Sequence, residues 1–261
     1  MFFTKKQKNK TPAEDDRCAI FTDFHSHILP RLDDGSRNDE ETLQMLRLSR
    51  EQGVKRIVAT PHFYPHLWSP ERFLGEREHA TEHLVSAVTS KKAEGEEFPK
   101  VYVGAEVAFF SGISKCDWME KLCLSGTRTI LVEMPFERWT DKVLDELIDI
   151  KSGLDLIPVI AHIERYFPCQ PKEFIDELFS QDVLIQFNAE SFINSKTRKR
   201  ALSLLEEGQI DFIGSDCHDL VSRAPNLGDA CKIIDKKLSK DALQKLNDFG
   251  DFVFADITPL I

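Results

Sequence analysis

The chain has 261 residues, enough for two small domains or for one α/β barrel with a single large core. Its 44 acidic and 34 basic residues give a formal charge of -10 at pH 7, which argues against a polyanionic partner such as nucleic acid. No stretch approaches the roughly 18 apolar residues of a membrane span, and no signal-peptide pattern follows the first residue, so we expect a cytoplasmic protein without direct membrane insertion.

Short β-branched or aromatic runs alternate with amphipathic helical patterns along the chain. After a polar tail predicted for residues 1–17, the expected strands are 18–24, 55–60, 100–107, 129–133, 156–161, 183–188 and 212–215. The expected helices between and after them are 39–52, 71–92, 141–152, 171–180, 195–207 and 229–248. In the first helix Asn38 is the expected N-cap, Glu41 sits at the capping-box position and Gly53 can end the helix.

Repeated strand-then-helix order is typical of a parallel sheet, and no Pro- or Gly-rich linker divides the chain. We therefore predict an α/β fold in which residues 18–261 form one domain, a TIM-like distorted (β/α)7 barrel. An open doubly wound sheet is the alternative.

Histidine or acidic residues follow most of the predicted strands. Because the carboxyl ends of parallel strands meet at one mouth of a barrel, these side chains should converge on one site. Five of the eight histidines in the chain belong to this group. The full set is His25, His27, His62, Glu106, Glu133, His162, Asp216 and His218.

Each of these signals alone is weak, but together they predict a metal centre at the carboxyl ends of the strands. His25 and His27 are two residues apart, which places both imidazoles on one face of a strand. Mixed imidazole and carboxylate donors without thiolate suit Mn, Fe or Zn. The donors are too many for one ion, so a carboxylate such as Glu106 should bridge two. Paired ions suit hydrolysis at phosphorus, so we expect a phosphoesterase.

Several motifs carry a family resemblance that covers about residues 20–261. They are Asp-Phe-His-Ser-His-Ile-Leu-Pro at 23–30 with Asp33-Asp34-Gly35, Ala-Thr-Pro-His at 59–62, Gly-Ala-Glu at 104–106, Val-Glu at 132–133, Val-Ile-Ala-His-Ile-Glu-Arg-Tyr at 159–166 and Gly-Ser-Asp-Cys-His at 214–218. With these motifs the sequence resembles the polymerase and histidinol phosphatase (PHP) superfamily. Within it, the sequence resembles bacterial capsule-locus protein-tyrosine phosphatases of the CpsB and YwqE type.

The resemblance implies a centre of up to three ions, usually Mn2+, with Fe, Co or Zn as alternatives. It places one ion on His25, His27, Glu106 and Asp216, a second on Glu106, Glu133 and His162, and a third on Asp34, His62 and His218. Asp34 enters only through the resemblance, because by itself it reads as a turn residue before Gly35.

Two arginines, Arg165 and Arg223, resemble the catalytic, substrate-binding residues of the family, whose guanidinium groups fit phosphate oxygens. The implied substrate is phosphotyrosine on a protein, specifically the cytoplasmic domain of a membrane tyrosine autokinase that controls capsular or exopolysaccharide synthesis and export. The alternative is a small-molecule phosphomonoesterase of the histidinol-phosphatase type.

Two further readings compete with a metallophosphatase. Residues 217–223 fit Cys-x5-Arg, the signature of cysteine-dependent tyrosine phosphatases, but this loop lacks glycines and Asp219 would repel an anion there. A non-enzymatic module that senses metal or phosphotyrosine is the other reading, and the full set of ligand residues argues against it.

Overall fold

The computed structural model describes residues 19–181, 183–238 and 240–261, so the predicted tail at 1–17 lies outside the described residues. The strands are β1 (Thr22–Ser26), β2 (Arg56–Ala59), β3 (His62–Phe63), β4 (Lys100–Val103), β5 (Glu106–Ala108), β6 (Thr129–Glu133), β7 (Ile157–Ile160), β8 (Leu184–Asn188) and β9 (Phe212–Gly214). The α-helices are α1 (Asp39–Glu51), α2 (Pro70–Ala93), α3 (Asp141–Leu154), α4 (Lys172–Leu178), α5 (Glu190–Ile193), α6 (Arg198–Glu206), α7 (Leu227–Lys237) and α8 (Lys240–Val253). Short 3-10 helices span Ile113–Lys115, Asp117–Leu122 and Ile163–Arg165.

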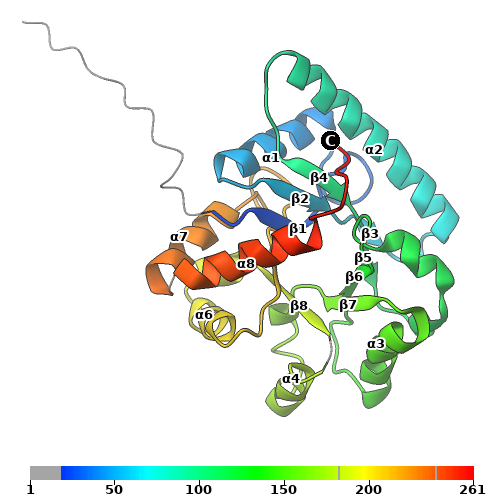
Figure 1. Cartoon of the computed structure of the whole chain (residues 1–261). Coiled ribbons are helices and arrows are strands. Elements are labelled where there is room, and N and C mark those ends of the chain that lie inside the picture. Colours follow the sequence, from blue (N-terminus) through cyan, green and yellow to red (C-terminus); the bar gives the residue numbers. More distant parts are fainter. Residues whose placement is uncertain (1–18, 182, 239) are drawn as a thin grey trace, which may run out of the picture.

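Every strand pair in the described chain is parallel. The strands form two runs, β1-β2-β4 and β3-β5-β6-β7-β8-β9, in which β2 with β3 and β4 with β5 are interrupted halves of two longer strands. A parallel bridge between Ser26 and Cys217 joins the first strand to the segment after the last one. The predicted distorted seven-stranded barrel is therefore confirmed, with most helices around its outside (Figure 1).

The alternation of side chains along the strands divides the core into two layers. Residues such as Ile57, Val101 and Ile130 face outward and pack against the helices. Inward-facing residues, including Val58 and Leu131, form a second cluster inside the barrel. This inner cluster consists of Phe24, Val58, Tyr102, Leu124, Leu131, Val159, Ala161, Phe212 and Phe254.

Phe254 follows α8 and closes the inner cluster at the end of the barrel where the strands begin, with its ring 4.2 Å from that of Tyr102 and 5.8 Å from that of Phe24. Apolar side chains thus fill the interior at that end. The polar residues that follow along the same strands lie at the opposite end, where the strands finish.

Local signals in the sequence explain most helix boundaries, with two corrections. Asn38 caps α1 as predicted, accepting a hydrogen bond from the amide of Glu41 at 3.0 Å, and Gly53 has a φ of 91° beyond the helix end. The predicted capping box is wrong, because the Glu41 carboxylate accepts from the amide of Arg37 at 2.7 Å, one residue before the cap.

The single helix predicted for 229–248 is wrong as well, since the chain forms α7 and α8 with Leu238 extended after α7. The two helices pack against different parts of the barrel, and one straight helix could not reach both. α7 packs beside α5, whereas Phe249 and Val253 of α8 pack against the inner cluster. None of the helices in the described ranges combines the length and apolar character needed to cross a membrane.

Gly214, at the end of β9, lies against His25, and a Cβ there would be 2.4 Å from the Cβ of His25. We expect Gly214→Ala to destabilise the fold by about 1 to 3 kcal/mol, because the buried backbone has no room to shift. Gly75→Ala is the matched control. This glycine lies in α2 with nothing within 4 Å of its Cβ position, so alanine should stabilise by about 0.5 to 1 kcal/mol. Thermal unfolding measures both, and equal melting temperatures would contradict the prediction.

Candidate metal centre

The two histidines of the first motif lie at a bulge near the end of β1. Asp23 pairs with Ile57 and Ser26 with Ala59, so three steps along β1 match two along β2. Such an extra residue bends a strand and is common next to active sites. The Nε2 atoms of His25 and His27 lie 3.1 Å apart.

Two carboxylates complete a compact group with these imidazoles. Glu106 Oε2 lies 3.3 Å from His25 Nε2 and 3.4 Å from His27 Nε2. Asp216 Oδ1 lies 3.5 and 3.4 Å from the same two nitrogens. Donors bonded to one ion at about 2.0 to 2.1 Å with tetrahedral angles are separated by about 3.3 to 3.4 Å. The distances from the two imidazoles to each carboxylate are therefore close to those between donors around one transition-metal ion. Within this set His25, His27 and Asp216 form a group of mutually close donors.

Glu106 faces different imidazoles with its two oxygens. Oε1 lies 2.8 Å from His162 Nε2, whereas Oε2 lies 2.9 Å from His62 Nδ1. Burial alone would raise the pKa of Glu106, but the surrounding imidazoles, chiefly His25, outweigh it and hold the pKa well below the usual carboxyl range. The side chain is therefore an ionised carboxylate that can serve two clusters.

Glu133 stands beside this group, with Oε1 3.6 Å from His162 Nε2. Burial and the negative charge of Glu106 raise the pKa of Glu133 to about 6. His62, Glu106 and Glu133 also have donor atoms within 4.8 Å of one another, so His62 adjoins the second predicted set as well as the third.

The third predicted set lies nearer the surface. Asp34 Oδ1 is 3.3 Å from His218 Nε2 and 3.4 Å from His62 Nε2, and 66% of the Asp34 side chain is exposed. His27 belongs to this cluster too, because its donor lies within 4.8 Å of those three. All nine predicted ligand residues thus lie at the mouth, and His27 and His62 each belong to two clusters. His162 is in none of the three clusters of mutually close donors found among the described residues, and it adjoins them through Glu106 and Glu133.

Several buried ligand atoms at the mouth make no regular hydrogen bond. They include His62 Nδ1, Glu106 Oε2 and His218 Nε2, although the first two lie only 2.9 Å apart. Buried polar atoms normally have a hydrogen-bond partner, and an unsatisfied one costs about 1 to 3 kcal/mol. Cations beside these atoms would satisfy them, so the residues present fit a metal-binding role.

Second partners turn the imidazole lone pairs toward the mouth. Gln186 Oε1 accepts a hydrogen bond from the backbone amide of His162 at 2.6 Å. Because this oxygen has no proton to donate, its contact with His25 Nδ1 at 3.1 Å is a hydrogen bond in which the imidazole N–H donates. A proton on Nδ1 leaves the Nε2 lone pair of His25 free for a metal. His27 Nδ1 faces the Asp33 carboxylate at 2.7 Å in the same sense.

His218 follows the same rule, with Nδ1 3.0 Å from the backbone oxygen of Asp216. Asn188 extends the network, because its Nδ2 donates to Asp216 Oδ2 at 2.8 Å while its Oδ1 accepts from Gln186 Nε2. Sequence reasoning missed Asp33, Gln186 and Asn188. The signal for the last two was present, since they are the polar residues at alternate positions of an otherwise apolar strand.

Two of the predicted ligand residues adopt left-handed backbone conformations, with φ of 32° at His162 and 54° at Asp216. Such conformations cost non-glycine residues about 1 to 3 kcal/mol and gather at functional sites. Backbone hydrogen bonds hold both, from His162 N to Gln186 and from Asp216 N to the His25 oxygen at 2.8 Å.

Arg165 and Arg223 lie beside the clusters. Arg223 Nη2 is 2.6 Å from Asp216 Oδ2, and Arg165 Nη1 is 3.8 Å from the same oxygen. Both arginines line a cavity of about 500 Å³ that also contains Asn188 and Ser222. The Arg223 side chain is 38% exposed and that of Arg165 is 44% exposed, so both guanidinium groups are accessible to an anion.

The Cys-x5-Arg interpretation fails on geometry. Cys217 is 1% exposed and packs in the outer core, where burial raises the pKa of its thiol to about 12. The amides of Val221, Ser222 and Arg223 donate to Asp219 Oδ1 at 2.6 to 3.0 Å. A carboxylate therefore occupies the place of the phosphate in a cysteine-dependent loop.

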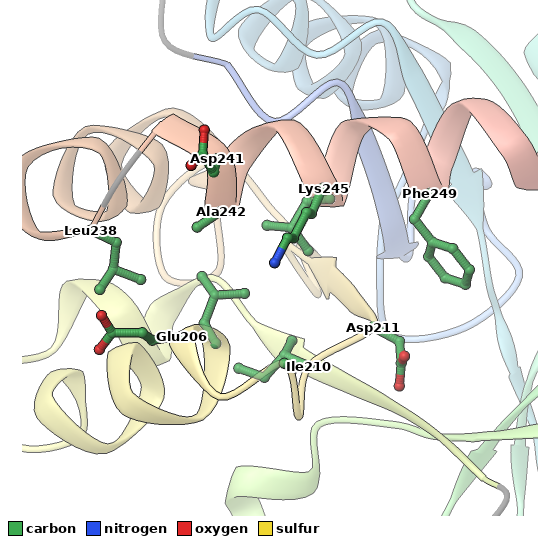
Figure 2. A pocket seen from close by; sticks show the side chains of 11 residues that line it. Glu206, Ile210, Asp211, Leu238, Asp241, Ala242, Lys245 and Phe249 are labelled. Atoms are coloured by element: carbon green, nitrogen blue, oxygen red, sulfur yellow. The ribbon is translucent and has the colours of Figure 1, made fainter.

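A second cavity, of about 330 Å³, lies at the opposite end of the strands. Figure 2 shows it between the end of α6 and α8, with Ile210 and Asp211 just before β9. None of the predicted site residues lines it. The predicted site residues lie at the other end, at the mouth where the strands finish.

Comparison with known proteins agrees with this arrangement. The family model for capsular polysaccharide synthesis proteins, CpsB/CapC, matches residues 21–248. The chain belongs to the CpsB/CapC family. It is 30% identical over 241 residues to the tyrosine-protein phosphatase CpsB of Streptococcus agalactiae, covering 86% of this chain and 93% of that protein. It is 26% identical over 246 residues to the tyrosine-protein phosphatase YwqE of Bacillus subtilis, covering 90% and 92%.

A solved structure shows that the fold of this CpsB/CapC protein is also that of its relatives. The match, with a TM-score of 0.75 at 23% identity, covers 91% of this chain and 95% of the other. It belongs to a crystallographic study of YwqE from Bacillus subtilis and CpsB from Streptococcus pneumoniae, described as metal-dependent tyrosine phosphatases.

Proposed function

We propose that this CpsB/CapC protein is a metal-dependent phosphatase that hydrolyses phosphotyrosine on proteins. One observation carries the proposal: two histidines and two carboxylates with metal-like spacing lie beside two accessible arginines. Family membership and relatives named as tyrosine-protein phosphatases support it.

In this proposal three ions are held by the nine residues at the mouth. His25, His27, Glu106 and Asp216 would hold the first, Glu106, Glu133 and His162 the second, and Asp34, His62 and His218 the third. Nitrogen and oxygen donors without thiolate support Mn2+ as the metal. Bound ions would supply a hydroxide at neutral pH and neutralise charge on a phosphate.

The arginines would bind and orient the phosphate. Both guanidinium groups now approach one oxygen of Asp216, and an incoming phosphate would offer them further oxygens at the edge of the same site. Guanidinium forks match phosphate oxygens in pairs, so they would also stabilise charge in the transition state. A phenolate, with a pKa near 10, needs less protonation on leaving than an alkoxide.

The accessibility of the mouth supports a protein substrate over a small phosphomonoester. Asp34 and both arginines are between about a third and two thirds exposed, so a phosphorylated side chain on a polypeptide can reach them. The family description concerns capsular polysaccharide synthesis. We therefore propose a cytoplasmic role on the tyrosine autokinase that controls capsular or exopolysaccharide production.

The first test separates metal from thiol chemistry. Because Cys217 is buried and its thiol is protonated at neutral pH, Cys217→Ser should retain most activity on a phosphotyrosine peptide, whereas EDTA should abolish it. Manganese added after dialysis should restore the rate. Loss of activity in Cys217→Ser together with resistance to EDTA would overturn the metal-dependent mechanism.

The second test concerns Glu106, whose two oxygens face two clusters, whereas Asp34 reaches only the outer one. Glu106→Gln should therefore lose more bound metal per chain than Asp34→Asn. Elemental analysis of folded, metal-loaded protein provides the measurement. Equal losses from the two variants would reject a bridging role.

The third test concerns Arg223. Removing it should leave metal content unchanged, because Asn188 still donates to Asp216, but kcat/KM should fall on the order of 10² to 10³, with kcat reduced. Arg223→Lys should recover only part of the loss, since a point charge lacks the paired hydrogen bonds. Arg50→Ala, which removes an exposed arginine of α1, is the control. Near-normal kcat/KM in Arg223→Ala would show that the phosphate lies elsewhere.

A further inference from the structure

Phe136 is an aromatic residue left open to solvent at the mouth. It lies three residues after Glu133, in the segment between β6 and α3, and 52% of it is exposed. Its ring lies nearly parallel to that of His162, at 17° with centroids 6.1 Å apart. The guanidinium carbon of Arg165 is 5.1 Å from the Phe136 ring centroid. The ring thus adjoins both a predicted metal ligand and a predicted phosphate-binding residue.

The exposure of Phe136 does not come from a loose loop. The amide of Met134 donates to the Tyr166 hydroxyl at 2.9 Å, and the amide of Trp139 donates to Gln170 Oε1 at 3.0 Å. Gln170 Nε2 in turn donates to the backbone oxygen of Glu137 at 2.7 Å. These bonds fix the backbone on both sides of Phe136.

A buried floor supports the ring as well. Tyr166 is fully buried, and its ring lies 5.1 Å from that of Phe136 and 5.1 Å from that of Trp139. Tyr166 also lies 5.6 Å from the ring of His162. Phe136 is therefore held on a rigid aromatic base while half of its surface stays available for contact.

We propose that Phe136 determines specificity by contacting the aromatic ring of the phosphotyrosine side chain, an inference that rests on the proposed function. In an aryl phosphate a single ester oxygen separates ring and phosphorus, so a phosphate beside Arg165 places the ring next to the groups that border it. Aromatic pairs gain from offset or edge contacts as well as from burial. A phosphoserine side chain has no ring and gains nothing from Phe136.

A simpler role must be separated from this one. The cation–π contact could make Phe136 only a support for Arg165, in which case its removal would weaken every phosphate ligand equally. An aryl contact instead weakens aryl ligands alone. The ratio between an aryl and an alkyl ligand of the same charge therefore distinguishes the two roles.

The experiment uses the metal-loaded full chain and two non-hydrolysable competitors, benzylphosphonate, in which a methylene replaces the ester oxygen, and methylphosphonate. In Phe136→Ala the inhibition constant of benzylphosphonate should rise on the order of tenfold, while that of methylphosphonate should change less than about twofold. KM for a phosphotyrosine peptide should rise with little change in kcat. Phe136→Tyr should behave as wild type because it keeps the ring. Phe252→Ala, which removes a 78% exposed ring of α8, is the matched control.

Parallel loss for both phosphonates would overturn the aryl contact and leave Phe136 as a support for Arg165. No change for either would show that the ring takes no part in binding. If the wild-type protein hydrolyses no phosphotyrosine peptide, the proposed function itself fails. If it does and the phosphonate ratio is unchanged in Phe136→Ala, only this inference fails.

Discussion

Five imidazoles and four carboxylates meet at one end of the barrel, and much of the molecule is arranged so that their lone pairs face one another. Such a group is stable only if a cation lies among the donors or if protons neutralise them. The Nδ1 groups of three imidazoles donate to Gln186 Oε1, the Asp33 carboxylate and the Asp216 carbonyl. These hydrogen bonds leave the Nε2 lone pairs directed at the mouth, where a metal ion could bind them.

The protein supports this centre with rigid neighbours. Gly214 lets β9 approach His25 closely, and Gly35 does the same for His27, where a Cβ would lie 2.1 Å from the His27 oxygen. The bulge in β1 and the left-handed residues His162 and Asp216 supply directions that regular strands cannot. The apolar inner cluster below fills the rest of the barrel, so the ligand residues rest on a packed base.

Sequence reasoning predicted the barrel and the convergence of most candidate ligands from one rule: parallel strands end on one side, so residues after strands converge. Asp34 and the division among three ions came only from the family resemblance. It missed the residues that orient the imidazoles. Gln186 contacts His25, 161 residues away in sequence, and Asp33 contacts His27, 6 residues away. Neither contact can be inferred from the local sequence pattern. The break at Leu238 depends on which surfaces α7 and α8 cover. The sequence does not indicate that Phe136 is exposed, because exposure is set by tertiary packing.

The bridge between Ser26 and Cys217 has a consequence for how the protein is made. It joins the first strand to the segment after the last one, so His25 and Asp216 approach only when nearly the whole chain is in place. Contacts of such long sequence separation form late, because the loop entropy must be overcome first. During synthesis His25 is made almost two hundred residues before its partner Asp216. The first cluster of candidate ligands is therefore complete only when the barrel closes, and a chain that ends before Asp216 has only part of this set.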